Sequence, residues 1–410
     1  MTAALRIYAD PSQFSEDQAN AMDLARDWHA SWPAANQYFA IGGYAGTGKT
    51  TILAALSKEF PNAAIVAPTG KAVNRLQMNK LWDAQTIHSL LYIPYESYTS
   101  IEECKWCAGD GTIQGEQCEA CHGTGEIEAE KPKRSTKYKK RTSIDAEVII
   151  CDEASMVNSQ VMNDMLTFSK PILFFGDHGQ LEPIGENPGI MTSPDVRLER
   201  IHRQAEGNPI IRLAQAFREG READVRQAVH RGSGRWQDAE KRCIVTRSYE
   251  FDDYLDSGMQ VICGFNKTRH KINKEIRARR GYQGVIPNPG ERIICLQNNR
   301  DFCCFNGQQA TVVKIHKKRK RTVDLEIDLD GVGKTIIPCL IEQFGKDKLD
   351  FYGNQDFAQF DYAYAITAHK AQGSEWDGVI VLEEISRSWN RARWQYTTTT
   401  RAKERIVYCF

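Results

Sequence analysis

The segment Gly43-Tyr44-Ala45-Gly46-Thr47-Gly48-Lys49-Thr50 constrains this chain most, because it has the G-x-x-x-x-G-K-[ST] spacing of a phosphate-binding loop. The apolar run 38–41 before it predicts a buried parallel strand, and residues 51–58 after it predict a helix. Glycines let the backbone wrap around phosphates, and the helix N-terminus directs free N–H groups at them. We therefore expect a nucleoside triphosphate to bind at Gly43, Gly46, Thr47, Gly48, Lys49 and Thr50, with Lys49 on the β- and γ-phosphates and Thr50 on Mg²⁺.

Strand and helix patterns alternate along most of the chain, which predicts an α/β fold with parallel sheets. A second α/β set begins near residue 261, after a crossing around 199–203. Between 290 and 330 the pattern changes to alternating β, which predicts a small inserted β-barrel. The buried strands are predicted at 38–41, 63–67, 147–151, 172–175, 261–265, 378–382 and 405–410.

The 410 residues suffice for two to four domains, and 41% hydrophobic with 26% charged residues is typical of a globular protein. The net charge of zero does not indicate a nucleic-acid-binding protein. However, seven Lys or Arg fall within 131–141, and 317–321 are all basic. These runs are either solvated loops or local phosphate-binding patches. No apolar stretch approaches 18 residues and the N-terminus lacks a signal-peptide core, so we expect a cytoplasmic protein.

Four of the twelve cysteines form an internal repeat, C-x-x-C-x-G-x-G at 104–111 and again at 118–125. This repeat resembles the zinc modules of DnaJ-type co-chaperones. Four thiolates in a tetrahedron suit a structural Zn²⁺ ion, which would fold a segment with few apolar residues. An iron–sulfur cluster or free thiols are the alternatives. The expected ligands are Cys104, Cys107, Cys118 and Cys121, and the other eight cysteines are expected in the core.

Polar residues follow several of the predicted strands. Asp152 and Glu153 follow the strand at 147–151, where an Asp can bind Mg²⁺ and a Glu can polarise the attacking water. Gln180 follows another strand and is a candidate sensor of the γ-phosphate. Gln18 stands three residues after Ser15, so a capping box gives it a purely structural explanation.

Nine segments in order resemble the superfamily 1 helicases of the Dda and RecD-like group. They are Gln18, GYAGTGKT, APTGKA, TIHSLL, ICDEAS, FFGDHGQLEPIG, RIHRQ, AITAHKAQGSEWDGVIV and TTTTRA. The resemblance implies two RecA-like domains with ATP between them and a single nucleic-acid strand across both. It also implies that Gln18 reads adenine, that Arg203 and Arg401 act as arginine fingers, and that Gly373 and Glu375 couple nucleotide to strand. By the same resemblance the nucleic acid contacts Pro68, Thr69, Lys71, Thr86, His88, Asn266, Thr367, His369 and Lys370.

The resemblance also implies a domain plan. The first RecA-like domain comprises 1–93 and 144–205, and the second comprises 206–283 and 350–410. A barrel of Src-homology type, with Asn298, Asn306 and Gly307, occupies 284–349. The segment 94–143 carries the cysteines where relatives have a duplex-splitting β-hairpin. We expect it to carry or brace that element, or to dock a protein partner.

The motifs and the resemblance together predict an ATP-dependent DNA helicase that moves on single-stranded DNA and unwinds fork duplexes in replication, recombination or repair. The resemblance alone implies movement from 5′ to 3′. Its expected cofactors are ATP, Mg²⁺ and Zn²⁺, and its expected partners include single-strand-binding or replisome proteins. An RNA helicase and a zinc-bearing, ATP-switched adaptor on DNA are the alternatives. The compact set of motifs resembles phage accessory helicases, which would act in a host cytoplasm.

Overall fold

The computed structural model describes residues 14–60, 62–94, 98–104, 107, 110–113, 116–131, 138–183, 185–200, 207–231, 235–247, 255, 257–297, 299, 302, 304, 306–330, 333–346 and 356–410. The chain forms two compact units. The larger one comprises Met1–Leu91, Thr142–Leu349 and Phe357–Phe410, and the smaller one comprises Tyr92–Arg141 and Asp350–Asp356. Within the described residues, no helix combines the length and apolar character needed to cross a membrane.

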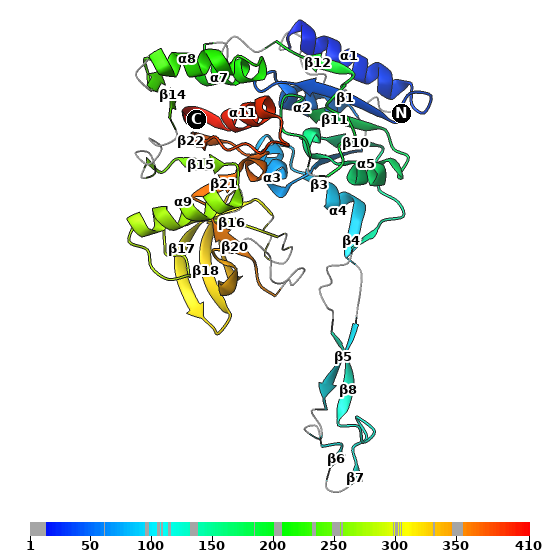
Figure 1. The fold of residues 1–410 in the computed structure, drawn as a ribbon. Helices are drawn as coiled ribbons and strands as arrows, with labels where there is room; N and C mark the ends of the chain where they lie inside the picture. Colours follow the sequence, from blue (N-terminus) through cyan, green and yellow to red (C-terminus); the bar gives the residue numbers. More distant parts are fainter. Residues whose placement is uncertain are drawn as a thin grey trace. The chain divides into compact units, whose positions relative to one another are not determined.

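The first sheet of the larger unit has six parallel strands in the order β12-β1-β11-β10-β2-β3 (Figure 1). Its central strands are continuous apolar runs, as expected for a parallel sheet covered on both faces. The strands are β1 (Tyr38–Gly43), β2 (Ala63–Ala67), β3 (Gln85–Thr86), β10 (Val148–Cys151), β11 (Ile172–Gly176) and β12 (Val196–Leu198). The helices are α1 (Glu16–Ala30), α2 (Lys49–Glu59), α3 (Gly70–Met78), α4 (Ile87–Leu91) and α5 (Ser159–Leu166), with a short 3₁₀ turn at Ala154–Met156.

The second sheet has the order β13-β14-β23-β22-β15-β21, and only the β13–β14 pair is antiparallel. The strands are β13 (Arg235–Gln237), β14 (Cys243–Thr246), β15 (Gln260–Cys263), β21 (Ala365–Thr367), β22 (Trp376–Leu382) and β23 (Ala402–Cys409). The helices are α7 (Pro209–Arg218), α8 (Glu222–Arg231), α9 (Asn266–Arg279), α10 (Ala368–Ala371) and α11 (Arg391–Thr399). The predicted α/β character is confirmed, with element ends shifted by a few residues.

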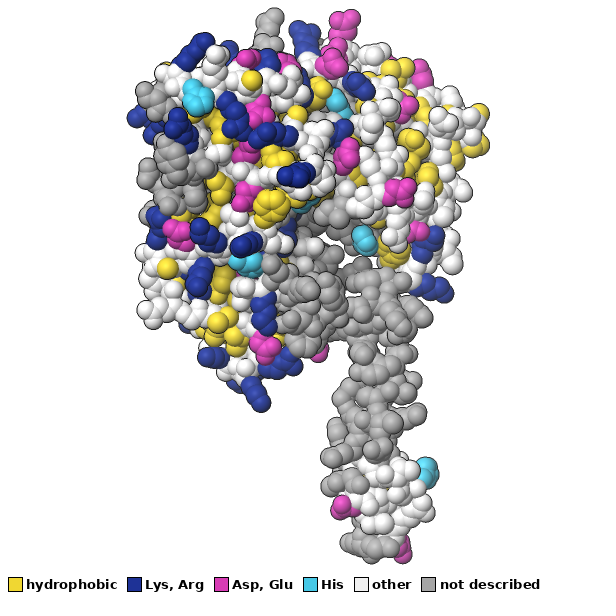
Figure 2. Space-filling model, viewed as in Figure 1, with side chains coloured by type: hydrophobic (Ala, Val, Ile, Leu, Met, Phe, Trp, Pro, Cys, Tyr) yellow, Lys and Arg dark blue, Asp and Glu magenta, His cyan; other side chains and the backbone are white. Residues whose placement is uncertain are grey.

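The third sheet is antiparallel, in the order β19-β18-β17-β16-β20. Along β18 every second side chain is buried, as its alternating sequence predicts. The basic run 317–321 lies at the β17–β18 turn, where Figure 2 shows a group of Lys and Arg side chains. Asn306 is exposed and Gly307 has φ +85°, whereas Asn298 lies outside the described residues. The strands are β16 (Arg292–Cys295), β17 (Gln309–Lys318), β18 (Thr322–Leu329), β19 (Gly333–Leu340) and β20 (Phe360–Tyr362), followed after β19 by a 3₁₀ turn at Ile341–Gln343.

The smaller unit contains three antiparallel strand pairs. Sequence periodicity did not predict them, because strands such as Tyr98–Glu103 and Glu126–Lys131 lack an alternating apolar pattern. The pairs are β4 (Tyr92–Pro94) with β9 (Tyr138–Lys140), β5 (Tyr98–Glu103) with β8 (Glu126–Lys131), and β6 (Thr112–Ile113) with β7 (Glu116–Gln117). We call this unit the arm. The predicted insertion at 94–143 falls almost entirely within it, and the domain boundaries remain predictions.

Seven of the eight cysteines outside the repeat are described, and all seven are buried, so their predicted place in the core is confirmed. They are Cys151, Cys243, Cys263, Cys295, Cys304, Cys339 and Cys409, whereas Cys303 lies outside the described residues.

A buried ion pair joins α9 to the start of the antiparallel sheet. Glu291 is fully buried, and its two carboxylate oxygens accept from Arg277 at 2.8 and 3.1 Å. Asn288 N and the Tyr364 hydroxyl also donate to this carboxylate, at 2.7 and 3.1 Å. Arg277 donates further to Gly284 O and to the Tyr362 hydroxyl, both at 2.8 Å. Both charges are therefore extensively hydrogen-bonded, as buried charges must be.

We expect Glu291→Ala to lower the free energy of unfolding by about 3–5 kcal/mol, because it leaves the Arg277 guanidinium buried without its counter-charge. Urea denaturation followed by circular dichroism measures the change. Glu275→Ala is the matched control, since Glu275 pairs with Arg279 on the exposed side of the same helix, and it should cost less than about 1 kcal/mol. Equal costs for the two variants would contradict this assignment.

Candidate nucleotide site and cysteine centre

The phosphate loop connects β1 to α2, as predicted. Gly46 and Gly48 both have φ +82°, a backbone conformation that residues with a side chain rarely adopt. The Lys49 ammonium donates to Gly43 O at 2.6 Å and Tyr44 O at 2.9 Å, so it lies inside the loop. No described side chain caps the N-terminus of α2. Its free N–H groups and Lys49 therefore form an anion-binding concavity.

Gln18 has the structural role that its spacing from Ser15 predicts. Ser15 N donates to Gln18 Oε1 at 2.9 Å, and the Ser15 hydroxyl caps α1 in return. Gln18 Nε2 also donates to Thr47 O at 3.0 Å, which ties α1 to the phosphate loop. The predicted adenine contact stays a prediction.

The acidic pair lies at the C-terminal end of β10, and both side chains are buried. A residue that the sequence did not single out, Arg75 of α3, contacts both of them: its Nη2 lies 3.0 Å from Asp152 Oδ2 and 2.8 Å from Glu153 Oε1. Burial raises the pKa of Asp152. Burial would also raise the pKa of Glu153, but Arg75, Arg401 and Lys49 together hold it below its usual value. Glu153 is therefore ionised at neutral pH, as a general base must be.

Gln180 lies in the loop after β11 and is held by Asp177. Asp177 Oδ1 accepts from Gly179 N at 2.9 Å, and Gln180 Nε2 lies 3.4 Å from Asp177 Oδ2. Gln180 Oε1 is buried and has no hydrogen-bond partner within the described part of the chain. A buried acceptor of this kind is suited to a ligand or a water at the site.

Of the two predicted arginine fingers, Arg203 lies outside the described residues. Arg401 is buried at the end of α11 and donates to Thr397 O, Ser374 O and Thr400 Oγ1. Its charge contributes to the lowered pKa of Glu153, so the structure brings Arg401 near the acidic pair. Gly373, with φ +70°, lies against the start of α3, and Glu375 is exposed.

The predicted nucleic-acid contacts follow neighbouring strand ends of the two parallel sheets. Thr69 and Thr367 cap α3 and α10, and Thr86 hydrogen-bonds Ser89, so each has a structural role as well. The Lys71 ammonium lies 4.4 Å above the Trp376 ring. Burial there lowers the pKa of Lys71 to about 7. Pro68 follows β2, His88 lies in α4, Asn266 begins α9, and His369 and Lys370 belong to α10.

An aromatic cluster beside these residues was not predicted. Phe265 stacks on Trp389 with ring centroids 5.4 Å apart, and His369 meets the edge of Trp389 at 5.3 Å. Phe265 is 41% exposed. The three residues come from separate segments of the chain, so only the packing of β15, β21 and β22 brings them together.

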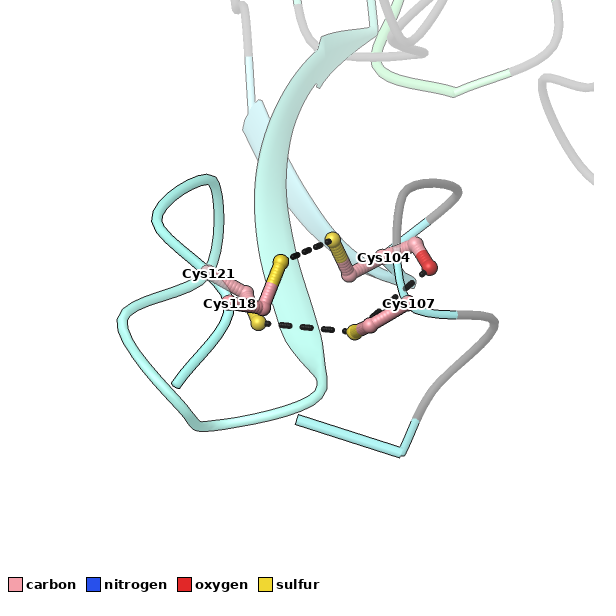
Figure 3. Close-up of side chains that lie close together, drawn as sticks. All are labelled: Cys104, Cys107, Cys118 and Cys121. Atoms are coloured by element: carbon pink, nitrogen blue, oxygen red, sulfur yellow. Dashed lines mark hydrogen bonds between the residues drawn. The ribbon is translucent and has the colours of Figure 1, made fainter. Parts of the chain in front are cut away.

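The four cysteines of the repeat converge (Figure 3). Their sulfur atoms all lie within 4.8 Å of one another, with 3.8 Å between Cys104 and Cys118 and 3.6 Å between Cys107 and Cys121. All four are buried although the surrounding side chains are largely exposed. Four thiols at these separations fit the tetrahedral set that Zn²⁺ accepts.

The two halves of the repeat are joined by reciprocal backbone hydrogen bonds. Cys104 N donates to Gly125 O at 2.8 Å, and the equivalent Cys118 N donates to Gly111 O at 2.9 Å. Gly111 N donates to Cys107 Sγ at 3.2 Å. Gly111 and Gly125 share φ +74°, and a Cβ at Gly111 would lie 2.5 Å from Gly123 O. The second glycine of each half is therefore favoured by its conformation, and Gly111 is required by space as well.

The family description "AAA domain" matches residues 14–239, which is more than half of the chain. The chain belongs to the AAA-domain family. A second description, "UvrD-like helicase C-terminal domain", matches residues 362–408.

Two curated relatives are similar to this AAA-domain chain. The ATP-dependent RecD2 DNA helicase of Deinococcus radiodurans is 24% identical over an alignment of 422 positions, which covers 96% of this chain and 48% of the relative. The RecBCD enzyme subunit RecD of Buchnera aphidicola is 33% identical over 162 positions, which cover 36% of this chain and 23% of the relative. The chain thus spans less than half the length of either relative.

Solved structures of Pif1 helicases share the fold. The Bacteroides Pif1 complex with ADP-AlF3 and single-stranded DNA is 18% identical with a TM-score of 0.54, over 96% of this chain and 92% of the other. Pif1 from Candida albicans is 16% identical with a TM-score of 0.53, over 97% and 94%. This AAA-domain chain therefore has the fold of two RecA-like domains, as predicted.

We expect Arg75→Gln to lower the free energy of unfolding by about 3 kcal/mol at pH 7.5 without nucleotide or Mg²⁺, because two buried carboxylates lose their cation. Arg75 is the largest of the charges that lower the pKa of Glu153, so without it this pKa rises and the folded variant binds a proton at a higher pH than the unmodified protein does. The deficit relative to the unmodified protein should therefore shrink as pH falls to 5.5, as measured by urea denaturation.

Arg26→Gln is the matched control for this experiment, because Arg26 pairs with Asp23 and Glu59 near the surface. Its cost should stay below about 1 kcal/mol. A deficit for Arg75→Gln that does not change between the two pH values would show that the carboxylates do not depend on Arg75.

Proposed function

We propose that this chain is an ATP-dependent DNA helicase that translocates 5′ to 3′ on single-stranded DNA and separates duplex strands. One observation carries the proposal: α11 of the second sheet, which leads into Arg401, contacts the phosphate loop of the first sheet through the Tyr396 hydroxyl, 2.9 Å from Ala45 N. A nucleotide site shared by two RecA-like domains couples hydrolysis to movement between them. The names of the RecD2 and Pif1 relatives, and the DNA in the Pif1 complexes, support DNA as the substrate.

The residues at the site fit ATP and Mg²⁺. Free N–H groups of α2 and Lys49 would hold the phosphates, and Thr50 with Asp152 would hold the metal. Mg²⁺ supplies positive charge to the β- and γ-oxygens when it is bound. Glu153 accepts a proton from the attacking water, and Gln180 Oε1 orients that water. Arg401, with Arg203, stabilises the negative charge that develops on the γ-phosphoryl group.

Single-stranded DNA would lie along the strand ends that carry Thr69, Lys71, Thr86, His88 and Pro68 in the first domain and Asn266, Thr367, His369 and Lys370 in the second. Hydroxyls, amides and cations contact phosphates regardless of sequence. Burial over the Trp376 ring lowers the pKa of Lys71 to about 7, so a phosphate bound beside it would favour the charged ammonium.

The cysteine centre fits one structural Zn²⁺ held by Cys104, Cys107, Cys118 and Cys121, with no position left for substrate.

The arm changes charge along its length. Residues 102–130 contain eight Asp or Glu and one Lys, whereas 131–141 contain seven Lys or Arg. At the cysteine end, Figure 2 shows acidic side chains and one His among the described residues. We propose that the zinc braces the arm while the basic run 131–141 contacts duplex phosphates. The acidic segment 102–130 is repelled by DNA.

Lys49→Ala should reduce DNA-stimulated ATP hydrolysis by about 10²- to 10³-fold, because it removes the main cation of the phosphate loop. Lys58→Ala is the matched control, since Lys58 lies exposed at the other end of α2, and it should keep full activity.

The direction of translocation is tested with the unmodified protein, by unwinding of duplexes that carry 5′ or 3′ single-stranded tails. Unwinding that needs the 3′ tail would overturn the proposed polarity, and stimulation by RNA alone would favour an RNA helicase.

Gly111→Ala should weaken zinc binding by about 10- to 100-fold although all four thiols remain, because the added Cβ would collide with Gly123 O. Competition with a chromogenic chelator measures the affinity. Gly220→Ala controls for backbone strain, since Gly220 has a similar φ of +71° but open space around it. Iron in the purified protein would overturn the zinc assignment.

The role of the arm is tested with Cys104→Ser combined with Cys118→Ser, which should abolish zinc binding and reduce unwinding while DNA-stimulated hydrolysis persists. If this variant folds, lacks metal and still unwinds normally, the arm serves a partner protein rather than strand separation.

A further inference from the structure

The Tyr396 hydroxyl connects two loops that lie far from it in the sequence. Tyr396 belongs to α11, and its side chain is buried. Its hydroxyl accepts a hydrogen bond from Ala45 N of the phosphate loop at 2.9 Å and donates one to Asp177 Oδ2 at 2.8 Å. These partners are 351 and 219 residues away in the chain. One oxygen atom of the second domain therefore bridges two loops of the first.

The Tyr396 ring is fitted to the same two loops. A Cβ added at Gly179 would lie 3.0 Å from the ring, which is tighter than an ordinary contact, so the ring packs closely on this loop. The ring also meets Tyr44 of the phosphate loop in an edge contact, with ring centroids 6.1 Å apart. Burial and the nearby Asp177 carboxylate raise the pKa of Tyr396 well above its ordinary value, so the phenol keeps its proton. The donor to Asp177 is thus present at every physiological pH.

The helix that carries Tyr396 also leads to Arg401. The next residue, Thr397, accepts from Leu181 N through its hydroxyl at 2.9 Å and from Arg401 Nε through its carbonyl at 2.9 Å. Gln372 Nε2 donates to Leu181 O at 3.1 Å. A displacement of Tyr396 would therefore be transmitted within one helical turn to the guanidinium of Arg401.

Backbone N–H groups of a phosphate loop are the donors that bind phosphate oxygens. In this structure the N–H of Ala45, the residue directly before Gly46 of the loop, is held by the Tyr396 hydroxyl, so a movement of the loop when phosphate binds would act on this hydrogen bond. We propose that Tyr396 is a positioning residue that reports phosphate occupancy of the loop to α11, and hence to Arg401 and the DNA-binding face of the second domain. This inference rests on the proposed function, because it assumes that the loop binds ATP.

Tyr396→Phe tests the proposal, because it removes the hydroxyl and keeps the ring. The coupling is the ratio of dissociation constants for a fluorescent oligo-dT strand with and without a non-hydrolysable ATP analogue. Losing both hydrogen bonds should reduce this ratio by about tenfold. Tyr408→Phe is the matched control, since Tyr408 is a buried tyrosine of the same domain that donates to Glu383 at 2.8 Å, away from the phosphate loop. It should keep the coupling.

Hydrogen–deuterium exchange of residues 391–399 gives a second readout that does not depend on DNA. The ATP analogue should change exchange there in the unmodified protein and in Tyr408→Phe, but not in Tyr396→Phe. An unmodified protein whose exchange at 391–399 ignores the analogue, or a Tyr396→Phe variant that responds fully, overturns the inference. Failure to bind oligo-dT, with the exchange response intact, would instead count against the proposed helicase function alone.

Discussion

Two negative charges buried at the end of β10 are the constraint around which the larger unit is built. Asp152 and Glu153 are each less than 5% exposed, and isolated carboxylates at such a place would protonate rather than stay charged. The surrounding elements supply positive charge from three directions: Arg75 from α3, Lys49 from the phosphate loop and Arg401 from the end of α11. Charge balance therefore links a helix, a loop and the opposite sheet. A site that needs cations from both sheets responds to any motion that separates them.

Much of this arrangement could be predicted from sequence, because parallel strands end at a common edge. Asp152 and Glu153 follow an apolar run directly, and Lys49, Thr50 and Gln180 lie a few residues beyond one, so the strand assignment also placed these polar residues. The family resemblance added Arg401, which no local pattern indicates. Buried cysteines in apolar strands were predicted for the same reason as the strands themselves.

The contacts that the sequence could not reveal are those between distant side chains. Arg75 lies on a helix whose amphipathic pattern explains its neighbours but not the direction of one guanidinium. Tyr396 and the stacked pair Phe265 and Trp389 meet their partners only when separate loops pack together. The strand pairs of the arm show no sustained apolar alternation in the sequence, so the pattern did not predict them. These strands carry Glu, Thr, Ser and Lys, so their pairing depends on something other than a core.

The reciprocal hydrogen bonds between the two cysteine halves indicate what holds the strands of the arm in register. The bond from Cys104 N to Gly125 O continues the β5–β8 pairing one step beyond Glu103 and Glu126. A polar two-stranded ribbon has no buried face to fix which residues pair, and it can slip by a residue or more. A metal ion bound by the four sulfurs would remove that freedom. It would fix the register of both strands along the ribbon although it contacts the ribbon only at one end.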